Sequence, residues 1–374
     1  MKALLAAVVL AASPAAAAEH YEYAFPDRTI FVYDEDRDFK LIQTIDVPEV
    51  VLTRGVAVDA PSGMLYISYR GAADRSDGFL LKYDLVNRRE VWTKQYDAGV
   101  DSMSLTPDGS KLYMPTGTHN VHGSWFLIDT TTGDITAKIV PPGVNVAPHN
   151  TIVSPDGTHV YLGTEFGKYF FVADTATQKI TKKIGPLREG IRPFTIDSRE
   201  RVAYVTLTRL LGFVAIDLAD RHVVTVDFGP KFSYDPATEQ LSDCPSHGIS
   251  LSPDDRDLYV IDTANSYVHV FDVRGMPAKA PAHVADIRMN HRFEGNEPSC
   301  VAAGQKWCGR EGWLQHSRDG RFVFVGDSGD VIDTKSRTVV GYLPALRDTR
   351  KHIEVTWQNG KPIGTSTRSG IGYK

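Results

Sequence analysis

Seven apolar runs along the 374-residue chain each end in an aspartate, and this pattern of hydrophobic and polar positions is the strongest signal in the sequence. The seven aspartates are Asp34, Asp84, Asp129, Asp174, Asp217, Asp272 and Asp333. Successive copies are separated by between 43 residues (Asp174 to Asp217) and 61 residues (Asp272 to Asp333), the length of one four-stranded blade with its loops. The repeat predicts an all-β fold, a seven-bladed β-propeller.

The two ends of the chain predict how the ring closes. The first copy, residues 30–34 followed by 39–43, has the pattern of only the outer two strands of a blade. Residues 352–356 and 363–366, which flank the turn Gln358-Asn359-Gly360, supply two more strands at the C-terminus. We therefore expect the last blade to be completed by N- and C-terminal strands together, which leaves no exposed inner edge.

The first residues have the pattern of a secretory signal. Lys2, the apolar run 3–12 and the small residues Ala16 and Ala18 predict a signal peptide over residues 1–18 and a single propeller domain over 19–374. This predicts a periplasmic or secreted protein. No later apolar run is long enough to cross a bilayer, so we expect no membrane insertion. The formal net charge of −5, without basic clusters, argues against nucleic acid as a partner.

An exported protein can form disulfides, and the chain has three cysteines: Cys244, Cys300 and Cys308. Both a local Cys300–Cys308 bridge and a Cys244–Cys308 bridge between neighbouring blades remain open. Cys244 also precedes His247 by three residues, a spacing that metal sites use, although a structural role for the thiol is favoured. The sequence does not indicate a protein partner or an oligomeric state.

A proline- and glycine-containing turn places the blades in register. Its copies include Thr106-Pro107-Asp108-Gly109, Ser154-Pro155-Asp156-Gly157 and Ser252-Pro253-Asp254-Asp255. These turns, followed by strands such as Val160-Tyr161-Leu162-Gly163 and Leu258-Tyr259-Val260-Ile261, resemble the YVTN-type repeat and the related lactonase-type seven-bladed propellers. The resemblance covers essentially the whole chain after the signal. It implies the fold strongly and leaves lactonases, quinoprotein subunits and proteins without catalysis as possible functions.

Five residues before each turn, the innermost strand begins, and there the copies diverge. The equivalent positions are Gly55, Asp101, His149, Arg192, His247, Gly312 and His352. Three imidazoles spaced around one axis suit a divalent transition metal such as Zn, Mn or Cu, with Asp101 as a fourth ligand or as an acceptor that orients an imidazole. The alternative is that these side chains only satisfy backbone groups at the mouth of the channel.

The same mouth is predicted to bind a small acidic molecule or a sugar acid. Arginine grips carboxylates with two parallel hydrogen bonds, and Arg192 is the first candidate because it lies on an innermost strand. The other candidate substrate-binding residues are Arg54, Arg70, Glu165, Arg209, Trp313 and Arg368.

Two classes of function follow from this site. In the first, a metal held by His149, His247 and His352 supports lactone hydrolysis or lyase-type cleavage of a uronate, with Arg192 holding a carboxylate. In the second, the protein is an exported binding or scaffold propeller without catalysis, as the YVTN-type resemblance equally implies. A copper or quinoprotein-associated redox subunit is a third and smaller alternative.

Overall fold

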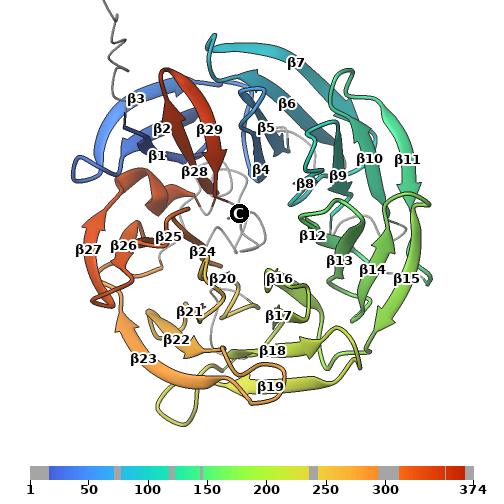
Figure 1. Cartoon of the computed structure of the whole chain (residues 1–374), viewed down its shortest axis with the longest axis vertical. Helices are drawn as coiled ribbons and strands as arrows, with labels where there is room; N and C mark the ends of the chain where they lie inside the picture. The colour runs from blue at the N-terminus through green and yellow to red at the C-terminus, as the bar shows by residue number, and fades with distance from the viewer. Residues whose placement is uncertain are drawn as a thin grey trace, which may run out of the picture.

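The computed structural model describes residues 17–70, 77–117, 123–143, 146–235, 243–293, 311–349 and 351–366. These residues form seven antiparallel sheets arranged as a ring around a central axis (Figure 1). The predicted all-β, seven-bladed propeller is confirmed. The described residues contain one helical element, the short 3₁₀ helix η1 (Pro344–Asp348), and no helix long and apolar enough to span a membrane.

Each blade uses its strands in the same order from the axis to the rim. The first strands of blades 1 to 7 are β4 (Thr53–Asp59), β8 (Ser104–Leu105), β12 (Pro148–Val153), β16 (Ile191–Ile196), β20 (Ile249–Leu251), β24 (Trp313–His316) and β28 (His352–Gln358). They form the inner edge of their sheets in blades 1 to 6. The second strands are β5 (Met64–Tyr69), β9 (Lys111–Pro115), β13 (His159–Thr164), β17 (Val202–Leu207), β21 (Asp257–Asp262), β25 (Phe322–Gly326) and β1 (Glu19–Ala24).

The third and fourth strands complete each blade toward the rim. The third strands are β6 (Gly78–Asp84), β10 (Trp125–Asp129), β14 (Phe170–Asp174), β18 (Gly212–Asp217), β22 (Tyr267–Asp272), β26 (Asp330–Asp333) and β2 (Thr29–Asp34). The outermost strands are β7 (Arg89–Tyr96), β11 (Ile135–Ile139), β15 (Lys179–Ile184), β19 (Val223–Asp227), β23 (Ala282–Arg288), β27 (Thr338–Tyr342) and β3 (Lys40–Asp46). The outermost strands are also the most exposed of each blade.

The repeated aspartates have a common structural role. Each one ends a third strand, and its carboxylate accepts a hydrogen bond from a backbone N–H two or three residues later, as Asp84 does from Val86 at 3.0 Å and Asp174 from Thr177 at 2.7 Å. The five other copies make the same contact. Such aspartate turns reverse the chain between the third and fourth strands. The period in the sequence is therefore the period of these turns.

Blade 7 closes the ring with N- and C-terminal strands together, as predicted, but the number of strands from the N-terminus differs from the prediction. The N-terminus supplies three strands of blade 7, because β1 pairs with both β2 and β28. The strand β29 (Lys361–Thr365) pairs with β28 and becomes a fifth strand on the inner side of this sheet. The sequence pattern predicts two N-terminal and two C-terminal strands, and this count is wrong for the N-terminus, because residues Glu19–Ala24 form an additional strand.

Hydrophobic side chains fill the spaces between neighbouring blades. Phe170 of blade 3 meets Phe194 of blade 4 edge-on with ring centroids 5.0 Å apart, and Phe213 and Phe271 repeat this contact between blades 4 and 5. Such offset aromatic contacts add to the stabilisation that comes from burial of apolar area. The core therefore lies between the blades, and the axis is left for polar side chains.

Candidate functional site

The predicted polar positions lie at or just before the starts of the innermost strands, near the ring's centre. Asp101 precedes β8, His149 lies in β12 and His247 precedes β20. His149 Nδ1 is 2.7 Å from Asp101 Oδ2, and the rings of His149 and His247 have centroids 6.3 Å apart. Figure 1 shows β8, β12 and β20 close to the axis. These three side chains from blades 2, 3 and 5 therefore form one cluster at the channel, which we call the mouth cluster.

The pair formed by Asp101 and His149 has a defined charge distribution. Both side chains are buried. Burial alone would raise the pKa of Asp101, but His149, Arg54 and Arg70 hold it well below its usual range. Burial lowers the pKa of His149 to about 4, against the opposing effect of Asp101. At neutral pH the pair is therefore an aspartate and a neutral imidazole.

This charge state fixes the tautomer of His149. An ionised Asp101 can only accept a hydrogen bond, so His149 Nδ1 donates its proton to it. The other nitrogen, Nε2, then carries a lone pair, and it is buried without a hydrogen-bond partner among the described residues. A lone pair held in this way can accept a proton from a bound molecule or coordinate a metal ion.

His247 is held on the other side of the cluster by blade 6. Its Nδ1 lies 3.0 Å from the backbone oxygen of Gly312, and its Nε2 lies 3.5 Å from Glu311 Oε2. The ring also packs against Trp313, with centroids 5.7 Å apart. Trp313 itself is covered by Lys351, whose ammonium lies 3.4 Å from the centre of the indole ring. This face of Trp313, predicted to bind substrate, therefore already carries a cation.

Arg192 is placed near the cluster but is strongly engaged by protein groups. Its Nη2 lies 2.8 Å from Glu165 Oε1 and 2.5 Å from Asp243 Oδ1, and its Nε donates to Thr208 at 3.0 Å. Burial raises the pKa of Glu165, although Arg192 opposes the shift. The arginine and Glu165 are thus brought together as an ion pair, rather than as separate groups for a substrate.

The other arginines that the sequence predicts to bind substrate divide into two groups. Arg54 lies 3.4 Å from Asp101 through Nη2, and Arg70 is buried close enough to lower the pKa of Asp101. Arg209 instead has an exposed side chain after β17, with a φ of 59°. Arg368 lies outside the described residues, as do Cys300, Cys308 and residues 1–16 of the predicted signal. Among the predicted arginines that the structure describes, Arg54 and Arg70 act on the mouth cluster's carboxylate.

The predicted three-histidine metal centre is not assembled by the described residues. No group that includes His149, His247 or His352 brings three His, Cys, Asp or Glu ligand atoms within 4.8 Å of one another in the described part of the chain. The nearby Cys244 is buried, and its Sγ contacts the carbonyl oxygen of Leu207 at 3.7 Å. His149 and His247 remain neighbours, whereas His352 belongs to a different pair.

His352 forms that pair with Glu22, a residue that sequence reasoning missed. His352 Nδ1 lies 2.6 Å from Glu22 Oε1, and both side chains are buried. Burial and the neighbouring Glu354, which stands opposite Glu22 across β1 and β28, raise the pKa of Glu22 well above its usual range. Burial also lowers the pKa of His352 to about 3. Both partners are therefore neutral, and the carboxylic acid of Glu22 donates to Nδ1.

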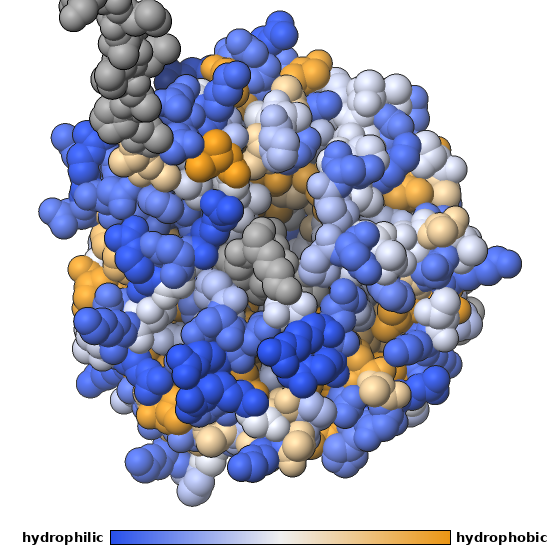
Figure 2. All heavy atoms as spheres, viewed as in Figure 1, coloured by the Kyte–Doolittle hydropathy of each residue, from blue (hydrophilic) through white to orange (hydrophobic). Residues whose placement is uncertain are grey.

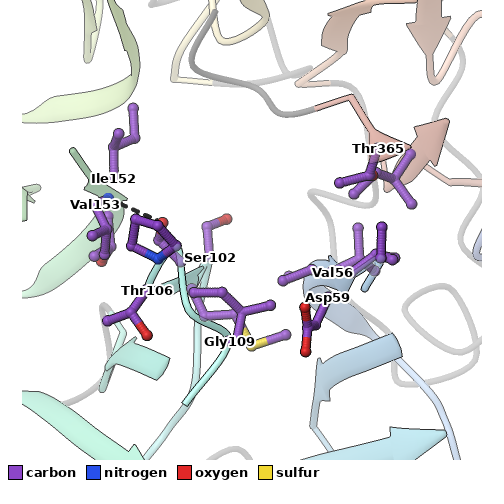
Figure 3. A pocket seen from close by; sticks show the side chains of 18 of the residues that line it. Val56, Asp59, Ser102, Thr106, Gly109, Ile152, Val153 and Thr365 are labelled. Carbon is purple, nitrogen blue, oxygen red and sulfur yellow. Dashed lines mark hydrogen bonds between the residues drawn. The ribbon is translucent and has the colours of Figure 1, made fainter. Parts of the chain in front are cut away.

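A cavity of about 450 Å³ lies along the innermost strands. Its walls come from β4, β8, β12 and β28, and β29 adds a further wall through residues such as Thr365 (Figure 3). His352, Lys351 and Trp313 also line it, and Lys351 donates to Ser102 at 3.2 Å. Figure 2 shows hydrophilic side chains gathered around the hollowed centre of one face of the ring. This volume lies within the range of small-molecule pockets.

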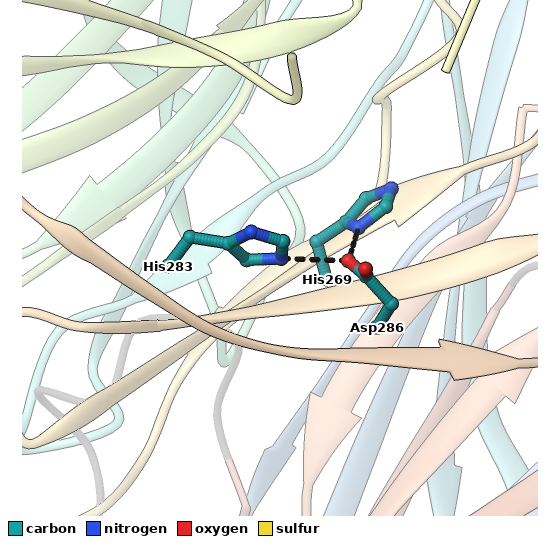
Figure 4. A group of neighbouring side chains, drawn as sticks. All are labelled: His269, His283 and Asp286. Atoms are coloured by element: carbon teal, nitrogen blue, oxygen red, sulfur yellow. Dashed lines mark hydrogen bonds and ion pairs between the residues drawn. The ribbon is translucent and has the colours of Figure 1, made fainter. Parts of the chain in front are cut away.

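A different group of side chains has the spacing of metal ligands. His269, His283 and Asp286 each offer an atom within 4.8 Å of the others (Figure 4). They lie on β22 and β23 of blade 5, on the outer side of the ring, and the sequence analysis did not identify them. The available signal was His269 itself, because this position, three residues before the strand-ending aspartate, is apolar in five other blades: Phe31, Leu81, Phe126, Phe171 and Val214.

Comparison with known proteins gives the fold and no family. No family model and no curated protein sequence matches the chain. A hydrazine synthase from Kuenenia stuttgartiensis is similar in structure, with a TM-score of 0.63, 15% identity, and 85% of this chain and 90% of that chain covered. A protein of unknown function from Desulfotomaculum acetoxidans gives a TM-score of 0.65 at 12% identity, covering 89% and 98%.

A third similar structure is the periplasmic gluconolactonase PpgL of Pseudomonas aeruginosa. Its TM-score is 0.61 at 16% sequence identity, and the match covers 93% of this chain and 98% of that chain. At such identities these likenesses establish a shared architecture and do not transfer an activity. The chain is thus a seven-bladed β-propeller whose function has to be argued from its own side chains.

Proposed function

We propose that this protein is an exported hydrolase of small lactones derived from sugar acids, acting at the mouth cluster. The observation that carries the proposal is the buried Asp101–His149 pair, in which Nδ1 is held at 2.7 Å and Nε2 has no partner among the described residues. A neutral imidazole oriented by a carboxylate is the usual form of a general base. The cavity along the innermost strands begins at Ser102 and Thr151, close along the chain to this pair, although neither Asp101 nor His149 lines it.

In this reaction His149 removes a proton from a water molecule through Nε2. The resulting hydroxide adds to the lactone carbonyl carbon, and the tetrahedral intermediate then breaks the ring C–O bond. The protonated imidazole returns its proton to the leaving alkoxide, which gives the open hydroxy acid. Asp101 stabilises the imidazolium that forms between the two steps, because it remains ionised throughout.

The positive field around the pair suits an acidic substrate. Arg192 and Arg54 both lower the pKa of His149 in the free protein. A bound anion would offset this field, so the pKa of His149 would rise toward the working pH where a base is most effective. The same field would stabilise the oxyanion of the intermediate and the carboxylate product. A small acidic molecule or sugar acid is therefore the proposed ligand.

Two further observations are consistent with the proposal. PpgL, which is named a periplasmic gluconolactonase, has the same architecture over 93% of this chain, so the fold can accommodate lactone hydrolysis. The N-terminal sequence pattern predicts export, and we propose a periplasmic or secreted location on that basis. Catalysis that depends on a metal shared by three histidines has less support, because the described residues do not bring ligand atoms of His149, His247 and His352 within 4.8 Å of one another.

The test is hydrolysis of a panel of aldono- and uronolactones, followed by pH-stat titration of the acid released. Wild-type protein should hydrolyse at least one lactone, with and without EDTA, and His149→Gln should lower kcat by about 10²- to 10⁴-fold. His291→Gln, which changes a partly exposed histidine after the last strand of blade 5, paired with Asp330 of blade 6, is the control and should retain full activity. Absence of hydrolysis by wild-type protein would leave the binding-protein interpretation, and loss of activity with EDTA would restore a metal-dependent one.

A further inference from the structure

We propose that blade 5 binds one divalent first-row metal ion of the zinc class through His269, His283 and Asp286. This site lies on the third and fourth strands of the blade, toward the rim of the ring (Figure 1). It is separate from the proposed hydrolysis, and neither activity requires the other. Two imidazoles and one carboxylate are a donor set that zinc and similar ions accept, with a further position left for water or another ligand.

The three donor atoms already converge. His269 Nδ1 lies 2.8 Å from Asp286 Oδ1, and His283 Nε2 lies 2.6 Å from the same oxygen. The two imidazole centroids are 5.7 Å apart, near the roughly 5 Å expected for two imidazoles on one tetrahedral ion with Zn–N bonds of about 2.0–2.1 Å. His283 Nε2 also lies 3.1 Å from the carbonyl oxygen of Ala285, a contact that the ion would replace.

A β-bulge makes this convergence possible. His283 and Asp286 are three residues apart, so in a regular strand they would point to opposite faces. In β23, however, Ala285 pairs with Val270 and His283 pairs with Phe271, which leaves one extra residue between them. The bulge turns both side chains toward His269, which stands directly opposite Asp286. Similar bulges occur between the third and fourth strands of other blades, but in blade 5 these three donors surround the bulge.

A second carboxylate orients the buried histidine from behind. His269 Nε2 lies 3.3 Å from Asp262 Oδ2, and both side chains are fully buried. Metal-binding histidines commonly contact a carboxylate through the nitrogen that does not bind the ion, which fixes the ring and its tautomer. Phe228 and Phe232 pack against the ring, with centroids 4.1 and 4.4 Å away. His269 is thus held rigidly with Nδ1 directed to Asp286.

Blade 5 departs from the other blades at this position. Where it has His269, five other blades have apolar side chains that pack into the spaces between blades, as Phe171 does. A buried histidine there costs desolvation that an apolar residue does not. The metal would join β22 to the exposed outer strand β23 and so stabilise the edge of the blade, in the way that a ligand bound only by the folded state raises its stability.

The experiment measures metal binding by the full-length protein after removal of metal with EDTA. Wild-type protein, equilibrated with Zn²⁺ and passed through a desalting column, should retain one equivalent by elemental analysis. Its Tm should rise by a few degrees with Zn²⁺. Co²⁺ should give the visible absorption bands of a site with nitrogen and oxygen ligands. His283→Ala and Asp286→Asn, which change exposed side chains on β23, should each abolish the bound equivalent, the Tm shift and the Co²⁺ spectrum.

His291→Ala is the matched control, because His291 forms a comparable histidine–aspartate pair with Asp330 at 2.6 Å. It should keep the metal. The proposal is overturned if wild-type protein binds no stoichiometric metal, or if His283→Ala retains it. Metal that is lost with His149→Gln but kept with His283→Ala would place the ion at the mouth cluster instead. Because lactone hydrolysis is assayed separately, failure of this proposal leaves the proposed reaction unaffected.

Discussion

Two buried histidine–carboxylate pairs lie at the innermost strands of the ring, and their contacts are almost the same. His149 meets Asp101 at 2.7 Å in blades 2 and 3, and His352 meets Glu22 at 2.6 Å in blade 7. In both pairs Nδ1 makes the contact and Nε2 has no partner among the described residues. Hydrogen-bond geometry alone therefore does not distinguish the two pairs.

The surrounding charges do distinguish them. Arg54 and Arg70 act on Asp101, so its pKa is lowered and it accepts the imidazole proton. Burial, reinforced by Glu354, raises the pKa of Glu22 without an opposing arginine in the described part of the chain, so Glu22 supplies the proton instead. The two imidazoles consequently have opposite tautomers: Nε2 of His149 carries a lone pair, whereas Nε2 of His352 carries a proton. The comparison indicates that the charged residues around the carboxylate decide whether its histidine partner is a base or a hydrogen-bond donor.

The largest expected effect comes from reversing the tautomer of His149. In Asp101→Asn the amide can donate to Nδ1, which would place the ring proton on Nε2 and remove the base. Lactone hydrolysis should fall by about 10²- to 10⁴-fold in kcat, with a smaller change in KM. Glu22→Gln is the matched change in the other pair and should leave kcat within about threefold of wild type. Equal losses in both variants would show that the two pairs do not differ in role.

The next effect concerns stability and its dependence on pH. Glu35 lies beside the Glu22–His352 pair, and burial, with Glu354 and Glu22, raises its pKa well above the ordinary value of 4.5. The folded state therefore holds a proton that the unfolded state releases, so stability is lost as pH rises above about this ordinary value. Asp101 has the opposite effect. Because its pKa is lowered, it stabilises the folded state above its ordinary value of 3.8, and this stabilisation is lost as the pH falls below that value.

Glu35→Gln should remove the share of the loss at high pH that comes from Glu35, while Glu22, whose pKa is also raised, keeps its own share. Both carboxylate oxygens of Glu35 are buried without a partner among the described residues, so the variant should gain about 1 kcal/mol or more in free energy of unfolding at pH 8. At pH 4 it should differ little from wild type. Urea denaturation at several pH values measures this, and an identical pH dependence in both proteins would contradict the assigned protonation.

The smallest effect tests the arginine field directly. Arg54 lowers the pKa of both Asp101 and His149, so Arg54→Met should move the acidic limb of the kcat/KM profile to higher pH. Because Arg54 also contributes to the field proposed to bind the acidic substrate, activity at pH 8 should fall as well. Relative to that value, the loss at pH 4 should be about two- to fivefold larger, equivalent to an interaction of roughly 0.4–1 kcal/mol. Arg209→Met, which changes an exposed arginine, is the control and should not move the limb.

The fold could be predicted to a large extent from the sequence, and the site only in part. The strand-ending aspartates made the blade count readable, because each one closes a local turn that requires no distant partner. The innermost positions could also be aligned, and Asp101, His149 and His247 do meet at the channel. The strand Glu19–Ala24 was missed, and with it Glu22, because its sequence EHYEYA contains no run of apolar residues.

Local sequence thus determined the turns, the strand register and the number of blades, since these depend on residues a few positions apart. Only the tertiary structure decided which carboxylate meets which imidazole, because Glu22 and His352 are joined by ring closure and Asp101 and His149 by the packing of two blades. Those encounters set the local charges, and through them the proton positions. Ionisation depends on burial and on neighbours within a few ångströms, which no spacing along the chain records.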